Sequence, residues 1–384
     1  MGRVLILDGM WNKSLAAVRS FGRKGFYVAV GERTRLATAI FSKYCKRRWI
    51  YSSPLRFPEK FLQDLEYELK NGKYDVIFPM EFPTQVLLTE NKHRFEGYSK
   101  IPFVDAYLAK KANDKAFIMR HAIEKGIDIP ATYFASNIEQ GAEIAKNILY
   151  PVLIKPRMSS GSRGIVKVKG ENELLPLYIK VHSHYPFPII QECIPGSETY
   201  GVALLLNYNS EVKASFVYKR LRTNPVWGGP STLRESVKRD DIKEIAHSLM
   251  ESLKWVGIAH IEFKVDPRDG KPKLLEVNPR FWGSLQLAIE SGIDFPFLLF
   301  KMAVEGDIKN VMDYNVGVRC RWLIPGDLLH FIKNPERFKL KPNFFDFKVK
   351  DDIISLRDPM PILGRISSAL TFLYDKEMKS LLSE

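Results

Sequence analysis

Acidic and amide side chains on two consecutive apolar segments suit metal chemistry by their type and spacing. Glu262 lies in the first segment, and Glu276 and Asn278 lie in the second. The intervening residues 266–270 read Asp-Pro-Arg-Asp-Gly, a strong turn signal that predicts a β-hairpin. The hairpin places Glu262 across from Glu276, to within a residue or two of register. Side chains two residues apart share a face of a strand, so Asn278 joins Glu276.

Two carboxylates that face each other on neighbouring strands repel, and a bound cation reverses the sign of that interaction. Glu262, Glu276 and Asn278 offer only oxygen ligands, which suit Mg²⁺ shared with phosphates, with Mn²⁺ as an open alternative. The competing interpretation is a surface hairpin with solvated acids, which the apolar residues around both glutamates disfavour. We expect His260, beside Glu262, to point to the opposite face of its strand and to be structural.

A second candidate site combines a lysine with a flexible loop. Lys155 ends the apolar segment 151–156, and residues 159–164 read Ser-Ser-Gly-Ser-Arg-Gly before another apolar segment begins. A Gly/Ser loop lets backbone N–H groups close on phosphate oxygens, and a neighbouring lysine adds a charge for the same oxygens. The loop is not a Walker A motif. By itself such a loop is more often a hairpin with a flexible turn than a phosphate-binding loop.

A third candidate lies where the apolar segment 189–194 runs into Pro-Gly. Backbone groups left free at such a strand end can hydrogen-bond the edge of an adenine, and Glu198 just beyond can accept from ribose hydroxyls. The alternative is a strand end followed by a solvated glutamate.

The elements that must position these side chains change in type along the chain. Up to about residue 105, apolar strands at 4–7, 26–30 and 75–79 alternate with helical patterns such as 58–70, which is typical of βαβ units and an open parallel sheet. Ligands bind beyond the carboxyl ends of such strands. This rule places residues 8–12 and 80–81 on one rim, although they are equally compatible with ordinary strand-end loops.

Beyond residue 105 the patterns differ. A helix is expected from Ala116 to Lys125, and it ends at Gly126. Between about 150 and 300 strand and hairpin patterns predict an antiparallel or mixed α+β unit. After about 305 the pattern weakens, with a final helix expected from Arg365 towards Leu382.

Composition limits the class of protein. The 384 residues carry a formal net charge of +14, and the three cysteines are far apart and form no CxxC pair. This excludes a disulfide scaffold and a zinc ribbon, and it favours a reducing cytoplasm. No apolar run approaches the roughly 18 residues of a transmembrane helix, and no signal peptide is expected. Because the basic residues are dispersed, small anionic substrates explain the charge as well as nucleic acid does, and we expect no nucleic-acid partner.

The order of these features resembles the ATP-grasp superfamily over about residues 1–300. The features are a lysine that opens a helix, a strand lysine with a Gly/Ser loop, the segment QECIPGSE, and a Glu-bearing strand followed by LLEVNPRFWGS. The similarity is greatest to the carbamoyl-phosphate-synthetase-like branch of predicted carboxylate–amine ligases.

The resemblance implies a fold of several parts. An α/β, Rossmann-like preATP-grasp domain occupies 1–105, and an α+β ATP-grasp domain of two subdomains follows. The first subdomain (106–188) carries the phosphate flap, the second (189–304) carries the hinge and the metal site, and residues 305–384 form a C-terminal extension of uncertain role.

The resemblance also implies roles for matched residues. Phosphate binding falls to Lys115, Lys155 and the flap, which comprises Ser159, Ser160, Gly161, Ser162 and Gly164. Adenine and ribose binding fall to Gln191, Glu192, Cys193, Ile194 and Glu198, although Cys193 itself is given no chemistry. The metal ligands are Glu262, Glu276 and Asn278, of which Glu262 is the less secure. Catalysis falls to Lys155, Arg280 and Arg234, with Arg234 in a loop at 228–234 that meets the acceptor.

The function implied is an ATP-dependent ligase that activates a carboxylate as an acyl phosphate and transfers it to an amine. Its cofactors are ATP and Mg²⁺, its partners are small-molecule acids and amines, and a homodimer is left open. A bicarbonate-using carboxylase stays possible within the same class, although no biotin-accepting segment is present. The alternative from another class is an ATP-binding regulatory module without turnover.

Overall fold

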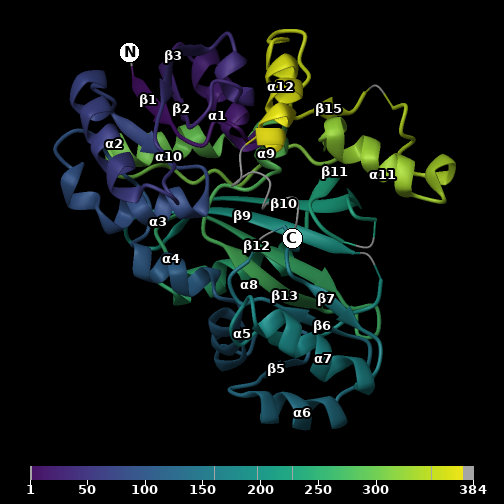
Figure 1. The fold of residues 1–384 in the computed structure, drawn as a ribbon. Coiled ribbons are helices and arrows are strands. Elements are labelled where there is room, and N and C mark those ends of the chain that lie inside the picture. Colours follow the sequence, from purple (N-terminus) through teal and green to yellow (C-terminus); the bar gives the residue numbers. More distant parts are fainter. Residues whose placement is uncertain (1, 160, 197, 227, 347, 375–384) are drawn as a thin grey trace.

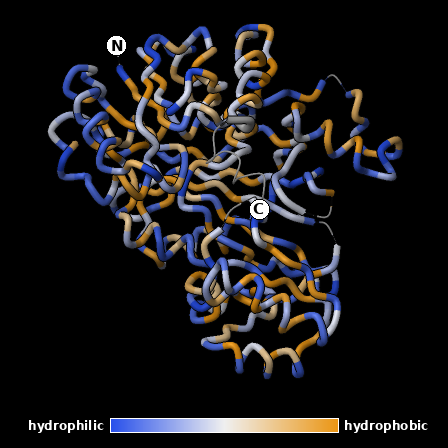
Figure 2. Tube along the Cα trace, in the orientation of Figure 1, coloured by the Kyte–Doolittle hydropathy of each residue, from blue (hydrophilic) through white to orange (hydrophobic). Residues whose placement is uncertain are grey.

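The computed structural model describes residues 2–159, 161–196, 198–226, 228–346 and 348–374 (Figure 1). Its strands form three sheets, and these are arranged so that their edges approach one central region (Figure 1). The most hydrophobic parts of the chain run through the strands and the helix faces that cover them, as Figure 2 shows. We describe the sheets in chain order.

The first sheet is parallel, as the alternating pattern predicts. Its four strands have the order β3-β2-β1-β4. They are β1 (Arg3–Ile6), β2 (Tyr27–Glu32), β3 (Cys45–Ile50) and β4 (Val76–Phe78). The helical elements of this region are α1 (Asn12–Arg23), η1 (Thr38–Phe41), α2 (Pro58–Gly72), α3 (Phe82–Glu90) and η2 (Lys92–Arg94).

The second sheet is small and antiparallel, with the order β5-β8-β6-β7. Its strands are β5 (Thr132–Phe134), β6 (Val152–Lys155), β7 (Val166–Val168) and β8 (Ile189–Glu192). The helices before and within it are α4 (Ala106–Asn113), α5 (Lys115–Glu124), α6 (Ile138–Lys146) and α7 (Glu171–His182). Helix α5 begins and ends within a residue of the predicted positions.

The third sheet has seven strands in the order β13-β12-β9-β10-β11-β14-β15, antiparallel except for the last pair. The strands are β9 (Thr199–Leu206), β10 (Val212–Thr223), β11 (Ser231–Ser236), β12 (Gly257–Val265), β13 (Pro272–Asn278), β14 (Arg319–Arg321) and β15 (Lys350–Asp351). The helical elements are α8 (Asp240–Ser252), α9 (Leu285–Ser291), α10 (Phe295–Glu305), η3 (Leu323–Asp327), α11 (Leu328–Lys333), η4 (Arg337–Lys339) and α12 (Pro361–Tyr374).

Apolar packing joins the first sheet to the third. One buried cluster contains β1, β2, β4 and α1 together with α9, α10 and side chains of β9 and β10. A second cluster packs α4, α5 and α8 against the third sheet, and a third cluster covers the small sheet with α6 and α7. The first sheet and the third sheet therefore share one core.

The C-terminal residues pack against the N-terminal region. Strands β14 and β15 extend the seven-stranded sheet, and α12 packs against η1 (Figure 1). Arg19 of α1 is 2% exposed and donates to Asp358 Oδ2 at 2.9 Å. The final helix begins at Pro361, four residues before the predicted start, and Leu382 lies outside the described residues. Within the described ranges, no helix has the length and apolarity needed to cross a membrane.

Candidate functional site

A cavity of about 1570 Å³ lies where the three sheets meet. Its walls come from the loops after β1 and β4, from α5, from the β6–β7 loop, from the faces of β12 and β13, and from the C-terminal segment. Ligand cavities usually measure about 300–1,000 Å³, so this one has room for a nucleotide together with a second molecule.

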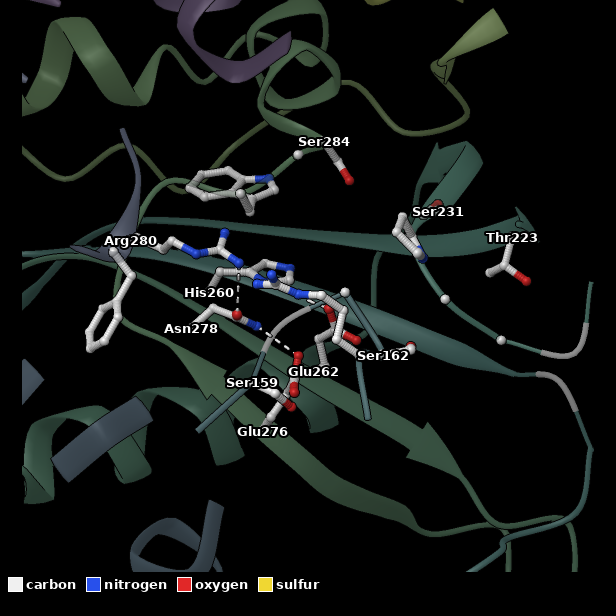
Figure 3. Close-up of a pocket in the computed structure, with 18 of the residues that line it drawn as sticks. Ser159, Ser162, Thr223, Ser231, His260, Glu262, Glu276, Asn278, Arg280 and Ser284 are labelled. Atoms are coloured by element: carbon white, nitrogen blue, oxygen red, sulfur yellow. Dashed lines mark hydrogen bonds and ion pairs between the residues drawn. The ribbon is translucent and has the colours of Figure 1, made fainter. Parts of the chain in front are cut away.

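The β12–β13 hairpin forms with the predicted register. Glu262 pairs directly with Glu276, and His260 pairs with Asn278. The turn residues between the strands make the hairpin compact, and the Asp266 carboxylate accepts from the Arg268 backbone N–H at 3.0 Å. Glu276, Asn278 and Arg280 follow one another along one wall of the cavity (Figure 3).

Lys115 compensates the negative charge of Glu276. The Lys115 ammonium lies 3.2 Å from Glu276 Oε2. Asn278 Nδ2 donates to Glu276 Oε1 at 3.0 Å (Figure 3). Burial opposes ionisation of Glu276, but Lys115, Asn278 and Lys155 outweigh burial and lower the pKa of Glu276 to about 2. Glu276 is therefore ionised at neutral pH.

The start of α5 fixes the position of Lys115. Asp114 caps the helix by accepting from the Ala116 N–H at 2.9 Å, and its carboxylate also pairs with Arg157. The Lys115 N–H donates to the Arg157 carbonyl at 3.0 Å, and the Lys115 ammonium donates to the Ser159 carbonyl at 2.9 Å. Helix α5 is thereby attached to the loop after β6.

Arg220, which the sequence analysis did not single out, compensates Glu262. Arg220 Nη1 lies 2.7 Å from Glu262 Oε2, and Arg220 also donates to the Gly229 carbonyl. Burial raises the pKa of Glu262. The negative charge of Glu276 also raises that pKa, whereas the positive charge of Arg220 lowers it. Arg220 has no sequence signal of its own, since it lies within a long strand with several other basic residues.

Lys155 is buried at the end of β6, where it lines the cavity and is 7% exposed. Its ammonium donates to Gln191 Oε1 on the neighbouring strand β8. Burial lowers the pKa of Lys155 to about 8, although Glu276 nearby favours the charged form. Gln191 is fully buried and does not line the cavity.

The predicted phosphate flap is the β6–β7 loop. Ser159, Gly161 and Ser162 line the cavity, and Gly164 does not. Gly161 and Gly164 both have φ of +68°, a backbone conformation that favours glycine. Ser160 lies outside the described residues.

The predicted adenine hinge comprises the end of β8 and the residues that follow it. Glu192, Cys193 and Ile194 line the cavity, and the Ile194 carbonyl accepts from Lys264 Nζ at 2.7 Å. Glu198 differs from the prediction, because it does not line the cavity. Its carboxylate pairs with Lys219 instead.

The expected role of Arg234 is corrected by the structure. Gly228 to Ser231 line the cavity, but Arg234 lies inside β11, is 1% exposed and does not reach the cavity. Its guanidinium lies 2.9 Å from Asp352 Oδ2. Because Asp352 is 118 residues away in sequence, no local pattern could have revealed this pairing.

The expected orientation of His260 is wrong. Residues 260 and 262 are two apart on one strand, so they share a face, and His260 lines the same cavity as Glu262. Its Nε2 lies 2.9 Å from the Tyr218 hydroxyl, and its ring stacks on Trp282 at a centroid distance of 5.7 Å. Burial lowers the pKa of His260 to about 3, so the imidazole is neutral at physiological pH. Its contacts with Tyr218 and Trp282 give it a structural role in the cavity wall.

The predicted rim of the first sheet also lines the cavity. Lys13, a second residue that the sequence analysis missed, lies 2.8 Å from Glu81 Oε1 and donates to the Phe281 carbonyl at 3.0 Å. Asp8 accepts from the Met80 and Glu81 N–H groups at 2.9 and 2.8 Å. These contacts join the loops after β1 and β4 to the segment that carries Arg280.

The residues predicted to hold a metal fit one by their donor chemistry. Two opposed carboxylates and the Asn278 amide oxygen present hard oxygen atoms, and in this structure Lys115, Arg220 and Arg280 supply the positive charge beside them. Within the described residues, no group of three or more His, Cys, Asp or Glu side chains is gathered as a metal site. The donor set therefore suits an ion that takes its remaining ligands from a phosphate-bearing substrate.

Comparison with known proteins yields one family and several distant relatives. A family described as "ATP-grasp in the biosynthetic pathway with Ter operon" matches residues 188–324. The carbamoyl phosphate synthase large chain of Thermotoga sp. (strain RQ2) is 23% identical over 357 residues, which are 89% of this chain and 31% of the relative. This chain thus spans about a third of the length of that relative.

Two solved structures share the fold at low sequence identity. The biotin carboxylase domain dimer of 2-oxoglutarate carboxylase from Hydrogenobacter thermophilus, in complex with MgADP, ADP and bicarbonate, has a TM-score of 0.66 and 16% identity. That match covers 82% of this chain and 73% of the other. L-amino acid ligase from Bacillus licheniformis has a TM-score of 0.59 and 16% identity, with 81% and 78% covered.

The family match includes β8 to β14 and therefore the predicted adenine hinge, the β12–β13 hairpin with the predicted metal ligands, and Arg280. The solved structures extend the likeness to the first sheet and the small sheet, because they cover about four fifths of the chain. Over residues 188–324 the chain thus matches an ATP-grasp family, and over most of its length it is similar at low identity to part of the large chain of carbamoyl phosphate synthase.

Proposed function

We propose that this protein is an ATP-dependent ligase that joins a carboxylate to an amine through an acyl phosphate. The observation that carries the proposal is the single cavity, which brings Lys115, Lys155 and Arg280 together with the Glu262–Glu276 pair. The same cavity continues to the rim of the first sheet, so that a nucleotide and a second substrate have room to meet.

In the first step of the proposed reaction, a carboxylate oxygen attacks the γ-phosphorus of ATP. A new O–P bond forms, the bond between the γ-phosphorus and its bridging oxygen breaks, and ADP leaves. Lys115, Lys155 and Arg280 neutralise the charge on the phosphate oxygens, so that catalysis rests on positioning and electrostatics.

In the second step, the amine nitrogen attacks the acyl carbon. The C–N bond forms, the bond from that carbon to the phosphate oxygen breaks, and inorganic phosphate leaves while the amine releases a proton to solvent.

Glu262, Glu276 and Asn278 would hold Mg²⁺. When bound, the ion supplies charge neutralisation for the phosphates of the nucleotide. Lys115 lies at hydrogen-bonding distance from Glu276, so this lysine orients the carboxylate and also reaches the phosphate side of the cavity.

The experiment is to trap the acyl phosphate with hydroxylamine. A panel of small acids and amino acids is incubated with Mg-ATP, and both ADP release and hydroxamate are measured. The correct acid is expected to accelerate ADP release and to yield hydroxamate without the natural amine, because the acyl phosphate forms first. Omitting the acid is the control for background hydrolysis.

Glu276→Gln tests the chemistry of the metal-binding hairpin. The variant removes an ionised oxygen ligand without opening a hole in the core, so hydroxamate is expected to fall at least about a hundredfold while the fold is kept. Glu235→Gln, which changes a carboxylate on β11 that pairs with Arg319, is the matched control. If no acid stimulates ADP release while ATP still binds tightly, the regulatory-module interpretation replaces the ligase.

A further inference from the structure

Arg365, at the C-terminal end of the cavity, lines its wall without a carboxylate partner in the described part of the chain. Its guanidinium carbon lies 5.4 Å from the centroid of the Trp322 ring. Burial alone lowers the pKa of Arg365 to about 10, with no acidic group acting in the opposite direction. Arg365 is half-buried. A cation that is partly removed from water is costly unless it is paired, so this guanidinium is suited to a ligand that brings the negative charge.

Asp352 also lines the cavity, but its carboxylate already accepts hydrogen bonds from other side chains. Asp352 accepts from Arg234 Nη2 at 2.9 Å, from Cys320 Sγ at 3.1 Å and from Asn12 Nδ2 at 3.4 Å. The contact with Asn12 also shows that this end of the cavity adjoins the start of α1.

Trp322 gives a second, independent observation. Its indole N–H is buried and has no acceptor among the described residues. The side chain also lines the cavity, directly beneath the Arg365 guanidinium. A buried donor without an acceptor carries a penalty that a bound anionic oxygen would remove.

Both residues are held in place by close packing. A Cβ atom at Gly364 would lie 2.7 Å from Phe41 Cδ2, so this glycine allows α12 to approach η1 closely. The backbone N–H of Trp322 donates to the Thr232 carbonyl at 2.8 Å, and Gly326 lies against the indole ring. Arg365 and Trp322 are therefore preorganised, which reduces the entropic cost of binding a ligand.

We propose that Arg365 and Trp322 form a subsite for an anionic oxygen group, a carboxylate or a phosphate, on the substrate that is ligated. The inference rests on the proposed ligase function and deepens it. The phosphates of ATP have Lys115 and Lys155 as partners in the proposed function. Trp322, which lies against Arg365, is joined to β11 just after the 228–231 loop, because its backbone N–H donates to the Thr232 carbonyl at 2.8 Å. The substrate class is then a carboxylic acid that carries a second anionic group away from the reacting carboxylate.

The test uses the full chain and measures how fast the Arg365 side chain is chemically modified. Modification of Arg365 by phenylglyoxal is followed by peptide mass spectrometry with and without saturating glutarate, inorganic phosphate or butyrate. Glutarate or phosphate is expected to slow modification of Arg365 about tenfold, because the anion covers the guanidinium. Protection by glutarate alone assigns a carboxylate, and protection by phosphate alone assigns a phosphate. Exposed Arg357, in the same segment, is the internal control and should be unaffected.

Substitutions give the second readout. With an acid that drives ADP release, Arg365→Gln is expected to raise the KM for that acid about tenfold with little change in kcat or in the KM for ATP. Arg365→Lys should restore part of the affinity, and Arg357→Gln should have no effect.

The outcomes separate this inference from the proposed function. The subsite is overturned if neither glutarate nor phosphate slows modification of Arg365 more than that of Arg357, or if Arg365→Gln leaves the KM for the acid unchanged. If Arg365 is protected but no acid stimulates ADP release, the subsite stands and the ligase proposal falls.

Discussion

At the scale of single residues, the buried lysine at the end of β6 has consequences for nucleotide binding. Lys155 is 7% exposed, and burial lowers its pKa to about 8, well below the usual value for lysine. Below pH 8 the ammonium is present and can meet a phosphate. Above pH 8 the free protein has lost that proton, and binding of a phosphate must take a proton up again.

We therefore expect the affinity for ADP to be constant from pH 7 to about 8 and then to fall by up to about tenfold per pH unit. Titrations from pH 7 to 9.5, read by calorimetry, measure this. Lys155→Arg keeps its charge throughout the range and should abolish the decline.

Lys13→Arg is the matched control, because burial also lowers the pKa of Lys13 to about 8 but its ammonium binds Glu81 and the Phe281 carbonyl. The decline should persist in this variant. A decline of the same size in Lys155→Arg would contradict the role given to Lys155.

The sequence predicted some site residues because their positions depend on local geometry. The pairing of Glu262 with Glu276 follows from one short turn between two strands. Arg220 and Lys13 were missed and Arg234 was misplaced because their partners come from other elements. The error at His260 was different, since the two-residue period of a strand already places it beside Glu262.

At the scale of elements, the β6–β7 loop connects two strands of the small sheet and borders the cavity. Its backbone reaches the left-handed region at Gly161, Ser162 and Gly164. Lys115 holds its first part through the Ser159 carbonyl at 2.9 Å. Backbone donors in such a loop gain partners only when a phosphate arrives, so binding should order it.

We expect amide hydrogen exchange over residues 157–165 to slow when Mg-ATP binds, as measured by mass spectrometry at saturating nucleotide. Exchange in β9, in the interior of the third sheet, should not change. Unchanged exchange in the loop would contradict its role as a phosphate flap.

A glycine pair provides the matched variants for this loop. Gly161→Ala and Gly164→Ala both place a side chain at φ of +68°, which costs about 1–2 kcal/mol. A Cβ at Gly164 would also lie 2.8 Å from Pro156 Cγ and Tyr185 Cε2, whereas Gly161 faces open space. Gly164→Ala is therefore expected to weaken nucleotide protection of the loop more than Gly161→Ala.

Helices and strands with a clear hydrophobic periodicity were predicted well, whereas three strands without one were missed. The first sheet was expected except for β3, an edge strand in which Lys46, Arg47 and Arg48 are all exposed and hide the strand pattern. The C-terminal strands β14 and β15 have three and two residues, too few to show alternation.

At the scale of the whole molecule, a buried ion pair joins the C-terminal segment to helix α1 of the N-terminal region. Arg19 donates to Asp358 Oδ2 at 2.9 Å and to the Ile353 carbonyl at 2.7 Å. Asp358 is fully buried and also accepts from Ser42 and from the Lys43 N–H. Removing one partner of such a pair leaves an uncompensated buried charge.

Asp358→Ala is accordingly expected to lower the free energy of unfolding by about 3–5 kcal/mol. The measurement is the midpoint of urea unfolding. Asp313→Ala removes an exposed carboxylate and serves as the control. The double variant Arg19→Met, Asp358→Ala should recover part of the loss, and a midpoint for Asp358→Ala equal to that of Asp313→Ala would contradict the argument.

The Arg19–Asp358 pair also matters while the protein is being made. The two residues are 339 positions apart, so a ribosome adds Arg19 long before the acid that neutralises it. During that interval α1 carries an unpaired guanidinium on a face that ends up buried, and the N-terminal region cannot reach its final packing. Nascent chains that stop before residue 358 are thus expected to stay open to proteases, while nearly full-length chains mature as a unit.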